Sequence, residues 1–200
     1  MTNDLVVLAN VACWGTVVIV WLTGALYNAR HAPRDRIRAE SRPVTLGAAS
    51  FLVCSVVVFF GRGFAQSLVV DVAWVQFLGF AVLVGSPAFA LWARFSLGTS
   101  WSVGAEVGGD RRLRTGGPYA VTRHPIYTGL LGMLLGSALL GGLGQGILLV
   151  VAGLIVFEVK IAMEERLLLA IFPDEYPGYR ERVPQLVPGL RLLNRRRIRA

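Results

Sequence analysis

The sequence is poor in charge, cysteine and histidine. Only 16% of its 200 residues are charged and 54% are hydrophobic, whereas a typical soluble domain has about 25% charged residues. The two cysteines, Cys13 and Cys54, lie in apolar stretches without zinc-ligand spacing, so we expect packing roles for both and no metal site. These shortages exclude a disulfide-rich secreted scaffold, a disordered chain and an ordinary cytosolic enzyme domain. The mean hydropathy of +0.59 instead indicates a protein that uses lipid as its solvent.

Long apolar stretches take the place of the missing charge. About 20 apolar residues cross the hydrocarbon core of a bilayer, so these stretches predict transmembrane helices. The last two are short and are joined by the glycine-rich residues 141–146, which predicts a tight helical hairpin. The five stretches are residues 5–27, 44–61, 72–93, 126–143 and 146–163.

The positions of the basic residues predict how these helices are oriented. Lys and Arg gather in cytoplasmic segments of membrane proteins. A secretory signal begins with a basic region, and none precedes the first helix, so we expect this helix to be retained rather than cleaved. Five helices with the N-terminus outside and the C-terminus inside place 19 of the 20 basic residues on the cytoplasmic side. Five arginines fall in residues 28–43, five in 94–125 and eight after residue 163, with Lys160 at the inner end of the fifth helix.

This arrangement predicts an all-α, polytopic membrane protein that forms a single domain over residues 1–200. Residues 1–93 supply three N-terminal transmembrane helices, and residues 94–200 supply a cytoplasmic loop, the hairpin and a C-terminal helical cap. The net charge of +8 then reflects orientation and membrane lipids rather than nucleic acid, because the basic residues 191–199 lack aromatic residues for base stacking. Arginine outnumbers lysine 19 to 1, as is common in GC-rich bacterial genes, so we expect a bacterial plasma membrane.

The loop before the fourth helix carries the first group of candidate functional residues. Its glycines permit close backbone approach to a ligand, and Trp101, Tyr119, His124 and Tyr127 are unusual choices for a passive loop. Pro125 is predicted in the first turn of the fourth helix, where the free amides of that turn favour an anionic group. His124 could hydrogen-bond there, or it could be only a capping or interfacial residue.

The end of the fifth predicted helix carries the second group of candidate functional residues. Lys160 and Glu164 are four residues apart and share one helix face, whereas Glu165 lies about a quarter-turn away and is expected to matter less. Ionisable groups at this depth are costly unless they are paired or line a polar cavity. A salt bridge within the helix and a polar pocket against the glycine-rich loop are both compatible with this pattern. Tyr176 and Tyr179, further on, could be simple interfacial belt residues.

These elements together resemble a known family. The sequence has Gly117-Pro118-Tyr119, then the run from Arg123 to Gly129 (RHPIYTG), then an apolar hairpin, Glu164-Glu165, and finally spaced aromatic residues before a Val-Pro pair. This order, over roughly residues 90 to 190, resembles the isoprenylcysteine carboxyl methyltransferases and their phospholipid methyltransferase relatives. The aromatic and Val-Pro positions are Phe172, Tyr176, Tyr179, Val183 and Pro184.

The resemblance implies a membrane enzyme that transfers a methyl group from S-adenosylmethionine to a lipophilic acceptor, with its active site facing the cytoplasm and S-adenosylhomocysteine as product. It implies a cofactor site between the loop and the last helices, under a lid formed by the C-terminal segment. Lys160 falls where the prenylcysteine enzymes have an arginine for the substrate carboxylate, and it keeps the charge but loses the bidentate fork. Lys160 would thus bind the acceptor, and Glu164 would act beside it in catalysis. The implied cofactor contacts are Arg111 and Leu113 in a strand-like segment, Tyr119, His124, Pro125, Ile126, Tyr127 and Glu164.

The sequence leaves two other classes of function and the identity of the acceptor to be weighed. Sterol-type membrane reductases share a His-Pro-x-Tyr motif but use NADPH, and Arg111, Arg112 and Arg114 could meet its 2′-phosphate. A non-catalytic scaffold or transporter is disfavoured because the chain shows no repeat symmetry. Within the methyltransferases, the acceptor could be a carboxylate, a lipid amine or a thiol.

Overall fold

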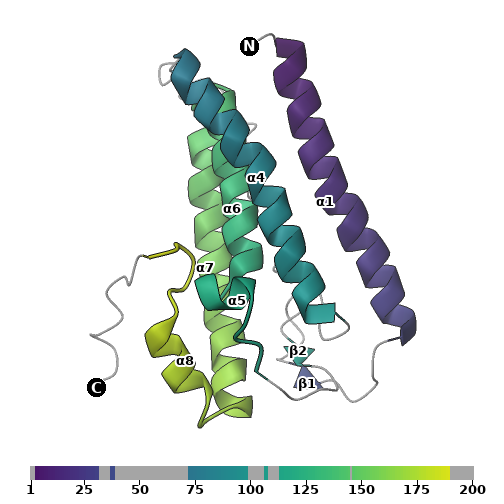
Figure 1. Ribbon diagram of the computed structural model, residues 1–200, viewed down its shortest axis with the longest axis vertical. Coiled ribbons are helices and arrows are strands. Elements are labelled where there is room, and N and C mark those ends of the chain that lie inside the picture. Colours follow the sequence, from purple (N-terminus) through teal and green to yellow (C-terminus); the bar gives the residue numbers. More distant parts are fainter. Residues whose placement is uncertain are drawn as a thin grey trace.

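Helices make up nearly all of the regular secondary structure in the described part of the chain (Figure 1). The computed structural model describes residues 3–31, 37–38, 72–98, 106–107, 113–144 and 146–189. One short antiparallel pairing joins β1 to β2, with Ile37 opposite Val107 and Arg38 opposite Glu106, which the all-α expectation did not include. The elements are α1 (Asn3–His31), β1 (Ile37–Arg38), α4 (Ala73–Leu97), β2 (Glu106–Val107), α5 (Pro118–Val121), α6 (Pro125–Leu140), α7 (Gly146–Ile171) and α8 (Tyr176–Arg182).

Four of the predicted transmembrane stretches are helices, and the other one, residues 44–61, lies outside the described residues. Among the described helices, α1, α4 and α7 are each long and apolar enough to cross a membrane, whereas α6 is apolar but shorter. Helix α7 continues beyond the predicted apolar stretch 146–163 and ends at Ile171. Glu164 and Glu165 therefore lie on the helix itself, more than a turn before its end.

Helix α4 packs closely against α6 because glycines allow their backbones to approach. A Cβ atom at Gly79 would lie 2.5 Å from the backbone nitrogen of Leu140, and one at Gly136 would lie 2.5 Å from that of Leu83. Small residues serve this purpose between membrane helices, where there is no hydrophobic effect to drive association and close van der Waals packing has to replace it. The close contact fixes the position of α6, whose first residues belong to the site described below.

Helix α1 completes the apolar core on the other side of α4 (Figure 1). Val17 from α1, Leu83 from α4, and Met133 and Leu140 from α6 form one buried cluster. The indole nitrogen of Trp14 also donates to Ser137 Oγ at 3.1 Å, which satisfies a polar group within the apolar packing. Large apolar side chains on the opposite faces of the long helices stay exposed, as expected for surfaces that meet lipid.

A tight turn connects α6 to α7 and makes them an antiparallel hairpin, as the glycine-rich segment predicts. Gly142, Leu143 and Gly144 have φ angles of 82°, 66° and 36°, a left-handed run that glycine adopts at little cost. Leu143 is the one non-glycine residue with positive φ in the described part of the chain, and its N–H donates to Ala138 O at 2.6 Å.

The C-terminal helical cap is also present. Phe172, Tyr176 and Tyr179 form a buried cluster where α8 folds back beside the end of α7. Tyr176 is 0% exposed and Tyr179 is 3% exposed, so the interpretation of these tyrosines as interfacial belt residues is wrong. Their burial anchors the segment that follows α8, residues 183–189, against the start of α6.

Candidate active site

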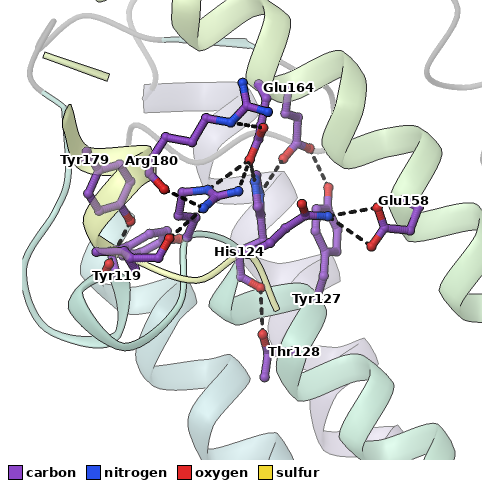
Figure 2. A network of polar contacts seen from close by, with 12 residues as sticks. Tyr119, His124, Tyr127, Thr128, Glu158, Glu164, Tyr179 and Arg180 are labelled. Atoms are coloured by element: carbon purple, nitrogen blue, oxygen red, sulfur yellow. Dashed lines mark hydrogen bonds and ion pairs between the residues drawn. The ribbon is translucent and has the colours of Figure 1, made fainter. Parts of the chain in front are cut away.

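Three parts of the chain meet at the start of α6: residues 122–128, the last turns of α7, and the segment after α8 (Figure 2). The segment after α8 is joined to the start of α6 by backbone hydrogen bonds. Arg123 N–H donates to Pro184 O at 2.8 Å, and His124 N–H donates to Gln185 O at 3.1 Å. Thr128 Oγ1 donates to Leu186 O at 2.7 Å. We refer to residues 183–186 as the docked segment.

Glu165 lies at the centre of a buried ion cluster. Its Oε1 atom accepts from Arg123 Nε at 2.9 Å and lies 2.8 Å from Arg123 Nη2. The same oxygen lies 3.4 Å from His124 Nε2, and Oε2 lies 3.3 Å from Arg180 Nε. Glu165 faces other partners than Glu164, as its place on the helix predicts, but the sequence did not indicate that both of its oxygens are engaged within the protein, where its side chain is only 9% exposed.

Glu164, its neighbour in the chain, has a different environment. Its Oε1 accepts a short hydrogen bond from the Tyr127 hydroxyl, and its Oε2 lies 3.5 Å from His124 Nδ1. The Glu164 side chain is 24% exposed. A carboxylate has about four lone-pair positions, so Glu164 retains the capacity to accept further hydrogen bonds from a ligand. The two adjacent glutamates therefore have distinct roles, one inside the fold and one facing outward.

Tyr127 is held along one face of α7 by residues at helical spacing. Its ring stacks on Phe157 with centroids 5.0 Å apart, and Lys160 Nζ lies 5.7 Å from the ring centroid, within the range of a cation–π contact. Glu164 binds the hydroxyl of the same tyrosine. The described residues contain no ion pair between Lys160 and Glu164, so the salt bridge considered from the sequence is not what organises this face.

His124 occupies the N-cap position of α6, but its side chain makes no capping hydrogen bond. Its ring instead lies between the two glutamates, with one nitrogen facing each carboxylate. Burial alone would lower the pKa of His124, but the hydrogen bonds and negative charges of Glu164 and Glu165 outweigh burial and raise this pKa above its ordinary value. His124 thus bridges the two carboxylates rather than acting as a simple cap, and their charges favour its protonated form.

Tyr119 connects the short helix α5 to the C-terminal cap. Its backbone carbonyl accepts a hydrogen bond of 2.6 Å from the Tyr179 hydroxyl (Figure 2). Burial, the charge of Glu164 and the nearby Tyr179 raise the pKa of the Tyr119 phenol, while Arg94 opposes them. The phenol is therefore neutral at physiological pH and available only as a neutral hydrogen-bonding group.

The structure brings together most, but not all, of the residues predicted for the site. Tyr127, Lys160 and Glu164 are in contact, His124 lies beside them, and Pro125 and Ile126 form the first turn of α6 as predicted. Leu113 packs instead on the aromatic cluster of Phe172, Tyr176 and Tyr179, and residues 113–115 have no regular secondary structure, so this part of the expected strand-like segment is absent. Arg111 lies outside the described residues.

Sequence reasoning assigned no role to Arg123, Arg180 or Gln185. Arg123 Nη1 donates to Arg180 O at 3.0 Å and to Val183 O at 2.5 Å, in addition to its contacts with Glu165. Gln185 Nε2 donates to both oxygens of Glu158 at 2.9 and 2.8 Å. Arg123 stands directly before the His-Pro pair and was visible in the motif, but a fold is needed to see that its partners lie 42 to 60 residues away.

The cluster is built for ion pairing within the protein rather than for metal binding. Arg123 and Arg180 bring two fixed positive charges to Glu165, which oppose the entry of a cation. Within the described residues, no group of three or more His, Cys, Asp and Glu side chains is placed to hold a metal ion.

Comparison with known families decides how this arrangement is classified. The family model described as phospholipid methyltransferase matches residues 74–175, which run from α4 through the hairpin to the start of the C-terminal cap. This chain belongs to that family. The match includes the RHPIYTG run and both glutamates.

Two individual relatives are similar to this chain in sequence over a shorter stretch than the family model matches. Protein-S-isoprenylcysteine O-methyltransferase of Schizosaccharomyces pombe is 37% identical over 82 residues, covering 40% of this chain and 34% of the relative. The cobalt-zinc-cadmium resistance protein CzcN of Cupriavidus metallidurans is 37% identical over 84 residues, covering 42% of this chain and 38% of the relative. The aligned stretch thus spans little more than a third of the length of these relatives.

A solved structure extends the likeness to most of the chain. The eukaryotic intramembrane Ras methyltransferase ICMT (isoprenylcysteine carboxyl methyltransferase) aligns with a TM-score of 0.57 over 90% of this chain and 68% of that one, at 23% sequence identity. The two proteins therefore share a fold. None of these matches favours the NADPH-dependent reductase that the sequence left open.

Proposed function

We propose that this protein is an integral membrane methyltransferase that uses S-adenosylmethionine to methylate a lipophilic acceptor, with a carboxylate as the methylated group. Family membership supports methyl transfer in general. The observation that carries the proposal for this chain is the difference between the two glutamates. Glu165 is fully engaged inside the fold, while Glu164 lies partly exposed beside Tyr127 and Lys160 with capacity left for a ligand.

The residues around Glu164 fit the chemical groups of S-adenosylmethionine. A ribose or an ammonium group is a hydrogen-bond donor, and a partly exposed carboxylate is a suitable acceptor for either. The N–H groups of the first turn of α6 have no acceptor within the helix, so they suit the carboxylate of the cofactor's amino acid part. Tyr119, His124, Tyr127 and Glu164 would hold the cofactor, together with Pro125 and Ile126 of that turn. When bound, S-adenosylmethionine supplies a methyl group on a positively charged sulfur.

Lys160 would receive the acceptor. Its ammonium group lies over the Tyr127 ring, four residues before Glu164 on the same face of α7. An ammonium group there attracts a carboxylate and leaves the methyl-donor contacts to Glu164. This role follows the position of the arginine in the prenylcysteine enzymes that the sequence resembles, with a point charge in place of a fork.

A carboxylate acceptor also suits the acid–base character of the site. With the donor held by these residues, a carboxylate oxygen of the acceptor would bond to the methyl carbon as the carbon–sulfur bond broke, and the electron pair of that bond would stay on sulfur. No proton has to be removed, whereas a protonated amine or a thiol would first need a base. His124 is poorly placed to accept that proton, because each of its ring nitrogens already faces a glutamate and the glutamates raise its pKa. The chain then contributes orientation and exclusion of water rather than proton transfer.

The membrane would supply the acceptor, and the cytoplasm the cofactor. The exposed apolar faces of α1, α4 and α7 suit a bilayer, in which a lipophilic acceptor reaches Lys160 laterally. The distribution of basic residues supports an orientation with the N-terminus outside, in a bacterial plasma membrane, with this site on the cytoplasmic side.

Calorimetry on the purified protein in detergent would test the cofactor part of this proposal. We expect S-adenosylmethionine and S-adenosylhomocysteine to bind with micromolar affinity and NADPH not to bind. Binding of NADPH without binding of either sulfur compound would overturn the proposal and restore the reductase alternative.

A further inference from the structure

The docked segment, residues 183–186, has no regular secondary structure of its own, yet it is attached to the start of α6 at several points. Its carbonyl groups at Pro184, Gln185 and Leu186 accept from Arg123 N–H, His124 N–H and Thr128 Oγ1, respectively. Its apolar burial is limited to Leu186 and to Val183, which packs on the aromatic cluster, so the segment depends on these hydrogen bonds to stay in place.

One side chain joins this attachment to the ion cluster. The guanidinium of Arg123 uses Nε and Nη2 on Glu165, and uses Nη1 on the carbonyls of Arg180 and Val183. The two carbonyls lie at the end of α8 and at the beginning of the docked segment. Arg123 therefore fixes three parts of the chain with one rigid, planar group: α7, α8 and the docked segment.

Lysine could not replace arginine here. Its single nitrogen could reach Glu165 or the two carbonyls, but it lacks the fixed fork that reaches both sides at once. Arg123 is also 6% exposed, so its charge has to be compensated within the protein, and Glu165 provides this compensation. The arrangement depends on the geometry of the guanidinium as well as on its charge.

The attachment lies directly beside the proposed cofactor residues. His124 follows Arg123 in the chain and faces both glutamates, and Tyr127 lies one turn later with its hydroxyl on Glu164. Release of the docked segment would free the backbone of residues 123 and 124 and let His124 move away from Glu164. The position of the docked segment and the shape of the Glu164 site are therefore coupled.

We propose that Arg123 is a positioning residue that holds the docked segment against the start of α6 and thereby keeps His124, Tyr127 and Glu164 in place for the methyl donor. It acts through these residues and touches neither the donor nor the acceptor. The inference deepens the proposed function and rests on it for the identity of the donor, whereas attachment of the docked segment by Arg123 can be measured without any ligand.

Hydrogen–deuterium exchange on the full chain in detergent tests the attachment. The amides of Arg123 and His124 donate to the docked segment, so a peptide covering them reports its release. Arg123→Lys should speed exchange in this peptide by about tenfold. Arg182→Lys is the matched control, because Arg182 is an exposed arginine at the end of α8, and it should leave exchange unchanged.

A second pair of variants weakens the attachment without changing any side chain of the ion cluster. Thr128→Val removes the hydroxyl that contacts Leu186 O at 2.7 Å and His124 O, in its own helical turn, at 3.1 Å, while Thr128→Ser keeps the hydroxyl. We expect faster exchange in the valine variant and near wild-type exchange in the serine variant. If Arg123→Lys does not fold, the two Thr128 variants test whether the docked segment protects the amides of residues 123 and 124. Equal exchange in the two variants would overturn the proposed attachment.

Kinetics separate positioning from direct binding. In Arg123→Lys the KM for S-adenosylmethionine should rise about tenfold in parallel with the faster exchange, with a smaller change in kcat. Weaker donor binding with unchanged exchange would mean that Arg123 contacts the donor itself, and faster exchange with unchanged KM would mean that the segment does not serve the site. Either result overturns the proposal. If the wild-type protein binds no S-adenosylmethionine, the proposed function fails, and exchange alone then decides whether Arg123 holds the segment.

Discussion

Arg123 and Glu165, which lie 42 residues apart in the chain, meet through two nitrogens and a single oxygen, with Nε 2.9 Å and Nη2 2.8 Å from Oε1. This pair joins the start of α6 to the last turns of α7 inside the protein. Because both side chains are almost fully buried, loss of either charge leaves the other without compensation. The pair therefore contributes to the fold, whereas the neighbouring Glu164 remains partly exposed and faces the candidate site.

The two glutamates should respond differently to removal of their charge. Glu165→Gln should destabilise the protein by about 3 kcal/mol, because it leaves two arginines beside a neutral amide. Glu164→Gln should destabilise the protein less, because Glu164 is partly exposed and, among the described residues, contacts only Tyr127 and His124, but it should weaken S-adenosylmethionine binding by about tenfold or more, since one ligand hydrogen bond to a charged group contributes about 1.5–3 kcal/mol. Thermal unfolding and calorimetry on both variants check this. Equal small effects of the two substitutions on binding would remove Glu164 from the site.

Stability should fall as pH rises through the titration of His124. The folded-state pKa of His124 is raised above its ordinary value of about 6.5, so the stabilisation from protonated His124 is fully present below that value and is lost as pH rises through the folded-state pKa. Thermal unfolding between about pH 5.5 and 9 measures this slope. His124→Gln should remove it, and an unchanged slope in that variant would show that another group is responsible.

Lys160 should affect the acceptor and not the donor. Lys160→Met removes the charge and keeps most of the chain length, so the KM for an N-acetylated S-prenylcysteine should rise about tenfold or more while S-adenosylhomocysteine binding stays within about twofold. Lys160→Arg keeps the charge over Tyr127 and should retain most of the activity. Unchanged acceptor kinetics in Lys160→Met would exclude Lys160 from acceptor binding.

Close packing between α4 and α6 predicts that Gly→Ala substitutions at two positions of these helices will differ in their effect on stability. Gly136→Ala places a Cβ 2.5 Å from the Leu83 backbone nitrogen and should destabilise the protein by about 1–3 kcal/mol. Gly85→Ala is the matched control, since no atom lies within 4 Å of a Cβ built there. The second variant should unfold at the wild-type temperature or slightly above it. Equal melting temperatures for the two variants would contradict the packing described here.

The sequence predicts much of this fold because the signals for membrane helices lie within short stretches of the sequence. A long apolar run, a Pro in the first turn and a glycine-rich turn each act over a few residues, and α1, α4, α6, α7 and the turn after α6 follow from them. The apolar run ends near residue 163 and does not by itself locate the end of α7, although the spacing of Lys160 and Glu164 treats this part as helical. In the fold, the charged residues of this part have partners at the start of α6 and in the docked segment, and the helix ends at Ile171.

The site was predictable only where residues share a helix face or a motif. Lys160 and Glu164 share a face by spacing alone, and His124, Pro125 and Tyr127 belong to one short run. The role of Glu165 depends on Arg123 and Arg180, which come to it from other elements, so helical geometry alone could not reveal it. Leu113 likewise packs on the aromatic cluster of the cap, and this contact joins residues too far apart in the sequence for a local pattern to predict it.

Transfer of a labelled methyl group tests the central claim most directly. Purified protein in lipid vesicles would be given S-adenosylmethionine labelled on its methyl group and an N-acetylated S-prenylcysteine, or lipids extracted from cell membranes. We predict label in the organic phase that is released as methanol by mild base, as from a methyl ester, and about tenfold less label with Glu164→Gln. Label that resists base would show an amine or thiol acceptor. No label with either acceptor source, from folded protein that also fails to bind S-adenosylhomocysteine, would contradict the account.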